Sequence, residues 1–261
     1  MHLSEPQPEH LPEAPIQRWV RPLVRFLHVE SASGIVLLLC TVLALALANS
    51  PWAEPFADLW KLHFRISVGP WGLDESLLHW INDGFMTVFF FVVGLEIKRE
   101  LVAGELRGPQ QAVLPVVAAL GGMVAPAMLY LLLQAGQPGQ AGWGIPMATD
   151  IAFVVGVLAI LGPKAPFSLK ILLLSLAIVD DIGAILVIAC FYATDISLVA
   201  LGLAALGFGV IVCCNRIGVR SVPIYVVIGA GIWLAFMQSG VHPTVAGVLL
   251  GLLTPASAWI G

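Results

Sequence analysis

Charged side chains are scarce in this sequence, and no long polar stretch separates its hydrophobic segments. Only 11% of the 261 residues are Asp, Glu, Lys or Arg, whereas 59% are hydrophobic and the mean hydropathy is +0.95. Soluble globular proteins contain about 25% charged residues. The composition therefore excludes an ordinary soluble domain and is typical of a helical membrane protein with several spans.

Cysteine is also rare, and none of the four cysteines occurs in a C-x-x-C pair. Cys40, Cys190, Cys213 and Cys214 lie within apolar runs or at their ends. This placement indicates packing residues rather than a disulfide framework or a metal site. No basic patch interleaved with aromatic residues indicates nucleic-acid binding. We therefore expect neither a cofactor nor a nucleic-acid partner.

The chain consists of a polar tail followed by eight apolar runs. Residues 1–16 are rich in Pro and Glu and lack the apolar core of a signal peptide, which predicts a disordered tail. Residues 17–261 are predicted to form a single transmembrane domain. We expect an all-α fold with about eight transmembrane helices, at residues 33–49, 77–101, 111–133, 145–161, 169–192, 196–214, 222–237 and 241–253.

The polar connection at residues 52–76 contains a strand-like pattern. His63-Phe-Arg-Ile-Ser-Val alternates, and Gly69-Pro-Trp-Gly follows as a turn, so we predict a small β-hairpin outside the lipid. With eight crossings, ten Lys and Arg residues fall on one side of the membrane and two, Lys61 and Arg65, on the other. Because positive residues favour the cytoplasmic side, we expect the N-terminus in the cytoplasm and the hairpin outside.

Three aspartates lie inside the predicted spans, and two of them are adjacent. Asp180 and Asp181 interrupt the apolar run 171–191, which has no other Asp, Glu, Lys, Arg or His. A charge at the bilayer centre costs at least about 2.5 kcal/mol, so such residues are usually functional. Carboxylate oxygens suit a hard cation such as Na⁺. Since neighbouring helical residues point about 100° apart, one aspartate can face an ion cavity while the other faces a neighbouring helix.

The third aspartate, Asp150, ends the motif Pro146-Met-Ala-Thr-Asp. Pro146 removes a backbone donor, and the Thr149 hydroxyl can bond to nearby backbone groups. Secondary transporters build ion sites where such interrupted helices line a cavity. We predict that Thr149 and Asp150 belong to the ion site. The alternative is a helix that simply begins at Pro146.

Buried carboxyl groups are suited to exchange of a cation for protons. Burial and a like-charged neighbour both favour the protonated form, so the proton is released near neutral pH. Protons and Na⁺ then compete for the same oxygens. If the site opens alternately to each side, cation uptake on one face requires proton release, and activity should rise steeply with pH.

Several motifs in order resemble the NhaA-type Na⁺/H⁺ antiporter family over nearly all of the chain after the tail. They are Gly94-Leu-Glu-Ile-Lys-Arg-Glu-Leu, Thr149-Asp150, Val179-Asp-Asp-Ile-Gly and Ser239-Gly-Val-His-Pro-Thr-Val-Ala-Gly. The resemblance implies exchange of Na⁺ or Li⁺ for more than one proton, activated at alkaline pH, in the bacterial inner membrane. It also implies an inverted-repeat fold with interrupted helices.

The resemblance assigns roles to the buried aspartates and to the predicted hairpin. Asp181 is the leading ion ligand and proton carrier, Asp180 is its partner, and Asp150 compensates charges where two interrupted helices cross. The hairpin resembles the contact through which family members form dimers. These roles are implied by the family and do not follow from the spacing of the residues.

The same resemblance links Glu96, Glu100 and His242 to the response to pH. A solvated helix end with pairs of opposite charges is the alternative interpretation of Glu96 and Glu100. Histidine normally changes charge near neutral pH, but a packed histidine beside Pro243 is equally consistent with the sequence. Asp83 is interpreted as a polar residue at the outer end of its helix.

Family members of this type continue for four further helices, which hold the second copy of the repeat and a lysine that pairs with one aspartate. We therefore expect this chain to be one half of the fold, incomplete at its C-terminus. Two other functions are considered. One is a truncated, transport-inactive membrane protein that acts as an interaction partner. The other is an intramembrane aspartic protease, which needs carboxylates on facing helices, whereas Asp180 and Asp181 are consecutive.

Overall fold

The computed structural model describes residues 30–68, 71–149, 153–154, 157–158, 161, 166–219 and 221–254. The predicted tail at residues 1–16 lies outside these ranges, and so does Asp150. The division into a tail and a single transmembrane domain therefore stays a prediction.

Helices dominate the described chain, as predicted. Four are long and apolar enough to cross a membrane: the continuous segment Leu77–Val102, α6 (Pro109–Leu133), the Ile171–Phe191 part of α8 (Phe167–Phe191), and α9 (Leu198–Arg216). The first comprises α4 (Leu77–His79), the π-helical turn η1 (Trp80–Phe85) and α5 (Met86–Ala103). α2 (Glu30–Ala48) and α3 (Ala53–Trp60) lie at an angle of 117° to each other. If the two helices are counted as one broken span, they make a fifth. Two apolar helices, α10 (Val222–Met237) and α11 (Thr244–Leu253), are shorter.

Three segments differ from the sequence-based expectation. The chain before Asp150 forms a 3₁₀ helix, η3 (Pro138–Met147), and becomes extended at Ala148, so no α-helix begins at residue 145. α11 begins at Thr244, because Pro243 fits a helix start better than a helix interior. α3 occupies a stretch expected to be a loop.

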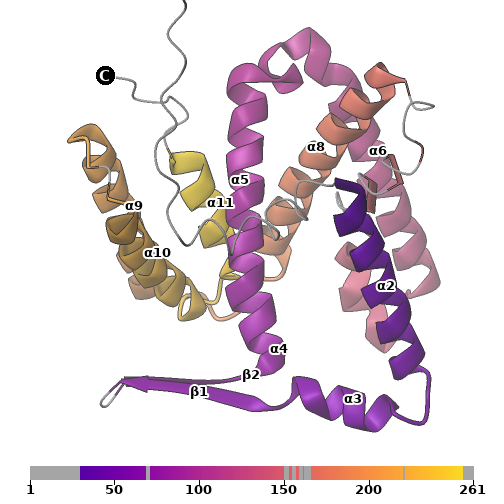
Figure 1. Ribbon diagram of the computed structural model, residues 1–261, viewed down its shortest axis with the longest axis horizontal. Helices are drawn as coiled ribbons and strands as arrows, with labels where there is room; N and C mark the ends of the chain where they lie inside the picture. The colour runs from indigo at the N-terminus through magenta and orange to yellow at the C-terminus, as the bar shows by residue number, and fades with distance from the viewer. Residues whose placement is uncertain are drawn as a thin grey trace, which may run out of the picture.

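The predicted β-hairpin is present. β1 (His63–Val68) pairs antiparallel with β2 (Trp71–Ser76), with His63 opposite Ser76 and Val68 opposite Trp71. In Figure 1 the hairpin and α3 lie together at one end of the helices, and the short η2 (Glu105–Arg107) joins α5 to α6 at the other. We call these ends the hairpin end and the η2 end.

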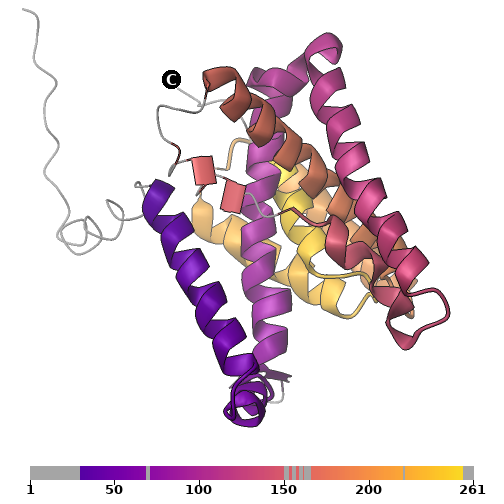
Figure 2. The ribbon, with the colours of Figure 1, turned by 90° about the vertical axis from the view of Figure 1, so that its right-hand side faces the viewer.

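α5 and α8 contact several other elements, whereas α9 and α10 pack against each other and against α11. Side chains of α5, α8 and α11 form one apolar cluster, which we call the α5–α8–α11 cluster: Phe90, Val93, Ile97, Ile178, Ile185 and Val248. A second cluster joins α6 and η3 through Ala119, Met123 and Met147, and Leu176, Val179 and Val187 of α8 pack against it. α8 therefore has α5 and α11 on one side and α6 and η3 on the other, as Figures 1 and 2 show.

The closest contact is between α5 and α11, which are side by side in Figure 1. The backbones of the two helices meet at Gly94, Gly247 and Gly251. At each of these glycines, an added Cβ would lie within 2.5 Å of a carbonyl oxygen of the facing helix. Small residues permit this approach between membrane helices. The short α11 is thus held tightly against the long α5.

Candidate functional site

The adjacent aspartates lie near the middle of α8 and are buried. Asp180 is 2% exposed and Asp181 is 7% exposed. Buried carboxylates occur in proteins when they are paired, hydrogen-bonded or bound to a cation. The surroundings of each aspartate therefore indicate what it can do.

The two carboxylates face different neighbours. Asp181 lies three residues after Ile178 and four before Ile185, so it shares the face of α8 that contributes to the α5–α8–α11 cluster. Asp180 lies four residues after Leu176 and shares its face, which packs toward α6 and η3. The geometry fits the roughly 100° separation expected for consecutive helical residues.

Thr149 approaches Asp180 from the extended segment after η3. Its hydroxyl donates a hydrogen bond of 2.8 Å to Asp180 Oδ2. The second oxygen, Asp180 Oδ1, is buried and has no hydrogen-bond partner among the described residues. Buried polar atoms normally have a partner, and a bound ion is one explanation when none is present. The structure thus brings together Thr149 and Asp180, two of the residues predicted for the ion site.

No cluster of three or more His, Cys, Asp or Glu side chains that could hold a metal ion occurs in the described ranges. Among the described residues, the oxygen atoms closest together at this place are those of the Thr149 hydroxyl and the Asp180 carboxylate, and oxygen ligands suit hard cations.

Glu96 and Glu100 lie near the η2 end, away from the hairpin. Arg99 Nη2 is 2.6 Å from Glu96 Oε1 and 3.9 Å from Glu100 Oε1. Glu100 is buried and lines a recess of about 620 Å³, together with Arg107, Gln111 and Ser175 among other residues. The arrangement contains the charge pairs expected of a helix end, and it also places a buried carboxylate in a recess lined by both polar and apolar residues.

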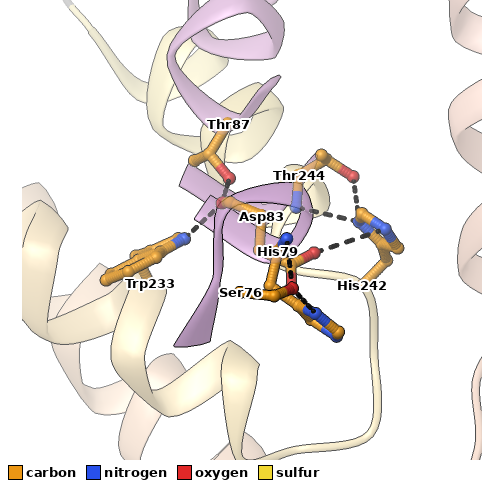
Figure 3. Close-up of polar contacts among 7 residues, drawn as sticks. All are labelled: Ser76, His79, Asp83, Thr87, Trp233, His242 and Thr244. Carbon is orange, nitrogen blue, oxygen red and sulfur yellow. Dashed lines mark hydrogen bonds and ion pairs between the residues drawn. The ribbon is translucent and has the colours of Figure 1, made fainter. Parts of the chain in front are cut away.

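His242 lies at the hairpin end, in the turn before α11 (Figure 3). Its Nε2 is 3.6 Å from Asp83 Oδ1, and its Nδ1 is 2.8 Å from the Thr244 hydroxyl oxygen. The Thr244 backbone nitrogen also lies 3.4 Å from Nδ1, so the ring is held between the start of α11 and Asp83. His242 and Asp83 thus face each other, which the sequence did not predict.

Two further side chains hold Asp83 in place. The Trp233 indole N–H and the Thr87 hydroxyl each donate to the Asp83 backbone carbonyl at 2.6 Å (Figure 3). The π-helical turn η1, to which Asp83 belongs, shifts the helical hydrogen-bond pattern, and such turns often occur at functional sites. Trp233 is 150 residues away in the sequence, so no local signal could have identified it.

Comparison with known proteins identifies the family. The family described as "Na+/H+ antiporter 1" matches residues 24–261. The chain belongs to this family. As an NhaA-family protein it is a multi-pass bacterial membrane protein, and its family consists of transporters rather than enzymes.

Curated relatives of this NhaA-family protein are similar throughout the chain. It is 56% identical over 252 residues to "Na(+)/H(+) antiporter NhaA 2" of Sorangium cellulosum, which covers 96% of this chain and 54% of the relative. It is 58% identical over 247 residues to "Na(+)/H(+) antiporter NhaA" of Rhodopirellula baltica, in an alignment that covers 95% of this chain and 56% of the relative. The Rhizobium meliloti antiporter NhaA is 54% identical over 250 residues, covering 96% and 57%. The chain spans a little over half the length of these relatives.

Proposed function

We propose that this chain binds Na⁺ or Li⁺ in exchange for protons, as part of an NhaA-type antiporter. The observation on which this proposal depends is the adjacent pair of buried carboxylates in the middle of a membrane-length helix, with Asp180 Oδ1 lacking a partner among the described residues. The relatives named Na⁺/H⁺ antiporters support the identity of the transported ions.

In this proposal Asp181 is the main ion ligand and proton carrier. Asp180, hydrogen-bonded to Thr149, is its partner. A cation can bind after a carboxyl group releases its proton, so protons and Na⁺ exclude each other from the same oxygens. Alternating exposure of the site to the two compartments then produces exchange. Asp150, which lies outside the described residues, is proposed to compensate charge near the site.

The response to pH is assigned to two groups of residues at opposite ends of α5. Glu96 and Glu100 with Arg99 form the first group, and the His242–Asp83 pair forms the second. The contact between His242 Nε2 and Asp83 Oδ1 joins the turn before α11 to the π-helical turn η1. Loss of this contact would alter the turn before α11.

The wider architecture is also a proposal. It comprises about eight crossings, half of an inverted repeat and a cytoplasmic N-terminus in the bacterial inner membrane. With eight crossings, ten Lys and Arg residues fall on one side and two on the other, and this bias supports the cytoplasmic N-terminus. The hairpin is proposed as a contact between two copies of the antiporter. Its strands β1 and β2 form a two-stranded sheet whose outer edges could pair with another chain.

The proposal is tested in everted membrane vesicles that contain this chain. Vesicles acidified by respiration should lose their pH gradient when NaCl or LiCl is added, more strongly at alkaline than at acidic pH. Choline chloride, and vesicles without the protein, are the controls. If neither salt moves protons at any pH although the protein is inserted, the chain is transport-inactive by itself and the interaction-partner function is favoured.

Replacing Thr149 with Val should weaken ion binding. Valine has nearly the same shape but cannot donate to Asp180 Oδ2. Hydrogen bonds to charged groups contribute about 1.5–3 kcal/mol, so we expect the half-saturating Na⁺ concentration for exchange to rise by about tenfold or more. Thr149→Ser keeps the hydroxyl and is the matched control. Equal half-saturating Na⁺ concentrations for the Val and Ser variants would contradict a role for this hydrogen bond in ion binding.

A further inference from the structure

The C-terminal end of α11 is half-buried, and each of its last carbonyl groups has a hydrogen-bond donor. A helix leaves its final carbonyl oxygens without intrahelical partners, and in a membrane each must find another donor. The Thr254 backbone N–H donates to the Leu250 and Gly251 oxygens, and the Thr254 hydroxyl also donates to the Leu250 oxygen. The Asn215 side-chain amide donates a hydrogen bond of 3.0 Å to the Leu253 oxygen. Two carbonyls remain, those of Leu252 and Thr254.

Lys98 of α5 donates hydrogen bonds to these two carbonyl oxygens. Its ammonium group donates to the Leu252 oxygen at 2.8 Å and also to the Thr254 oxygen. Both contacts are partly buried and join residues more than 150 positions apart. The C-terminal end of a helix bears partial negative charge, so a cation is favoured there electrostatically as well. Lys98 is thus the charged cap of α11.

The neighbouring cation, Arg99, has a different environment. It is 62% exposed, and its ion pairs are with Glu96 and Glu100 of its own helix. Consecutive helical residues point about 100° apart, which separates the two cations. Lys98 therefore connects two helices, whereas Arg99 connects carboxylates within one.

The cap adjoins the face of α8 that bears Asp181. Ile97, which precedes Lys98, belongs to the α5–α8–α11 cluster, and Leu252, whose carbonyl Lys98 binds, packs against it. The same cluster includes Ile178 and Ile185, which flank Asp181 on its face of α8. A shift of the α11 end would therefore move the apolar surface beside this aspartate.

We propose that Lys98 is a positioning residue for ion binding: by holding the end of α11 against α5, it fixes the apolar surface next to Asp181. This inference rests on the proposed function, because it assumes that Asp181 binds the ion. Small displacements around a site can change its performance by orders of magnitude. Removal of the cap should therefore change both the dynamics of α11 and the affinity for Na⁺.

The experiment compares Lys98→Met, Lys98→Arg and Arg99→Met in the purified full chain. Hydrogen exchange of the peptide spanning α11 measures how strongly the cap protects the last turn of this helix. Equilibrium binding of radioactive Na⁺ to the folded fraction measures the affinity of the ion site. In Lys98→Met we expect exchange of the last-turn amides of α11 to accelerate about tenfold. We also expect the half-saturating Na⁺ concentration to rise about threefold or more.

The two other variants identify the cause. Arginine can donate to both carbonyls, so Lys98→Arg should restore slow exchange and Na⁺ affinity. Arg99→Met removes a neighbouring positive charge without touching α11 and should leave hydrogen exchange of α11 unchanged.

Each outcome is decisive. Unchanged hydrogen exchange in Lys98→Met would overturn the cap, and faster exchange with unchanged Na⁺ affinity would reduce Lys98 to a structural residue. If the unsubstituted chain binds no Na⁺, the proposed ion site fails, and the positioning role fails with it. Hydrogen exchange would then still decide whether Lys98 caps α11.

Discussion

Replacing Asp181 with Asn is expected to abolish Na⁺-driven proton movement while the protein still inserts into the membrane. The amide has almost the shape of the carboxyl group, so packing on the buried face of α8 is retained. It cannot release a proton or present a negative charge to a cation, and both steps of exchange are lost. Groups that transfer protons typically contribute 10²–10⁴-fold, so we expect a loss of at least about 100-fold.

Asp195→Asn is the matched control for this substitution. Asp195 is exposed in the connection between α8 and α9 and has a φ of 47°, a conformation that asparagine adopts as readily as aspartate. The same chemical change outside the site should leave exchange unaltered. Exchange is measured in everted vesicles at matched protein amounts. Undiminished Na⁺-driven proton movement in Asp181→Asn would rule out this residue as the ion ligand.

The second large effect is expected where α5 and α11 touch. Adding a methyl group in Gly247→Ala would place Cβ 2.2 Å from the Thr87 carbonyl oxygen and 3.1 Å from the Phe91 amide nitrogen. Both are backbone atoms and cannot rotate away, so the two helices must separate. Overpacking of this kind costs about 1–3 kcal/mol, which corresponds to a fall in unfolding temperature of about 5 °C.

Gly209→Ala in α9 provides the comparison, because no atom other than the neighbouring backbone of α9 lies within 4 Å of the added Cβ. Alanine is favoured over glycine in helices by about 0.5–1 kcal/mol, so this variant should be as stable as the unsubstituted protein or more so. Thermal unfolding in detergent measures both variants. Equal unfolding temperatures would show that the backbones of α5 and α11 are not in contact as described.

The long apolar helices were largely predictable from the sequence. The run at residues 111–133 became α6 and the run at residues 222–237 became α10, with boundaries within two residues. Hydrophobic length and polar breaks determine such segments locally. The hairpin was predictable for the same reason, because strand alternation and a Gly-Pro turn are local signals.

Other elements depend on contacts that no local pattern encodes. The π-helical turn at Trp80–Phe85 coincides with a hydrogen bond from Trp233, and the 3₁₀ helix ending at Met147 packs its last side chain against α6. The start of α11 was placed too early, since the His242-Pro243 pair forms the turn before the helix rather than its first residues. Local propensity is a weak guide where tertiary contacts compensate for irregular backbone.

The sequence by itself determined that this is a helical membrane protein with ionisable groups in its interior, because apolar length and isolated aspartates are visible in one dimension. It also predicted that Thr149 and Asp180 belong to one ion site; the structure joins the two by a hydrogen bond between separate segments, and the ion site itself stays a prediction. Only the tertiary structure decided which helix each aspartate faces, that His242 faces Asp83, and that Lys98 caps α11. The physical reason is that each of these contacts depends on the relative rotation and depth of packed helices, which arise from the whole bundle rather than from any single segment.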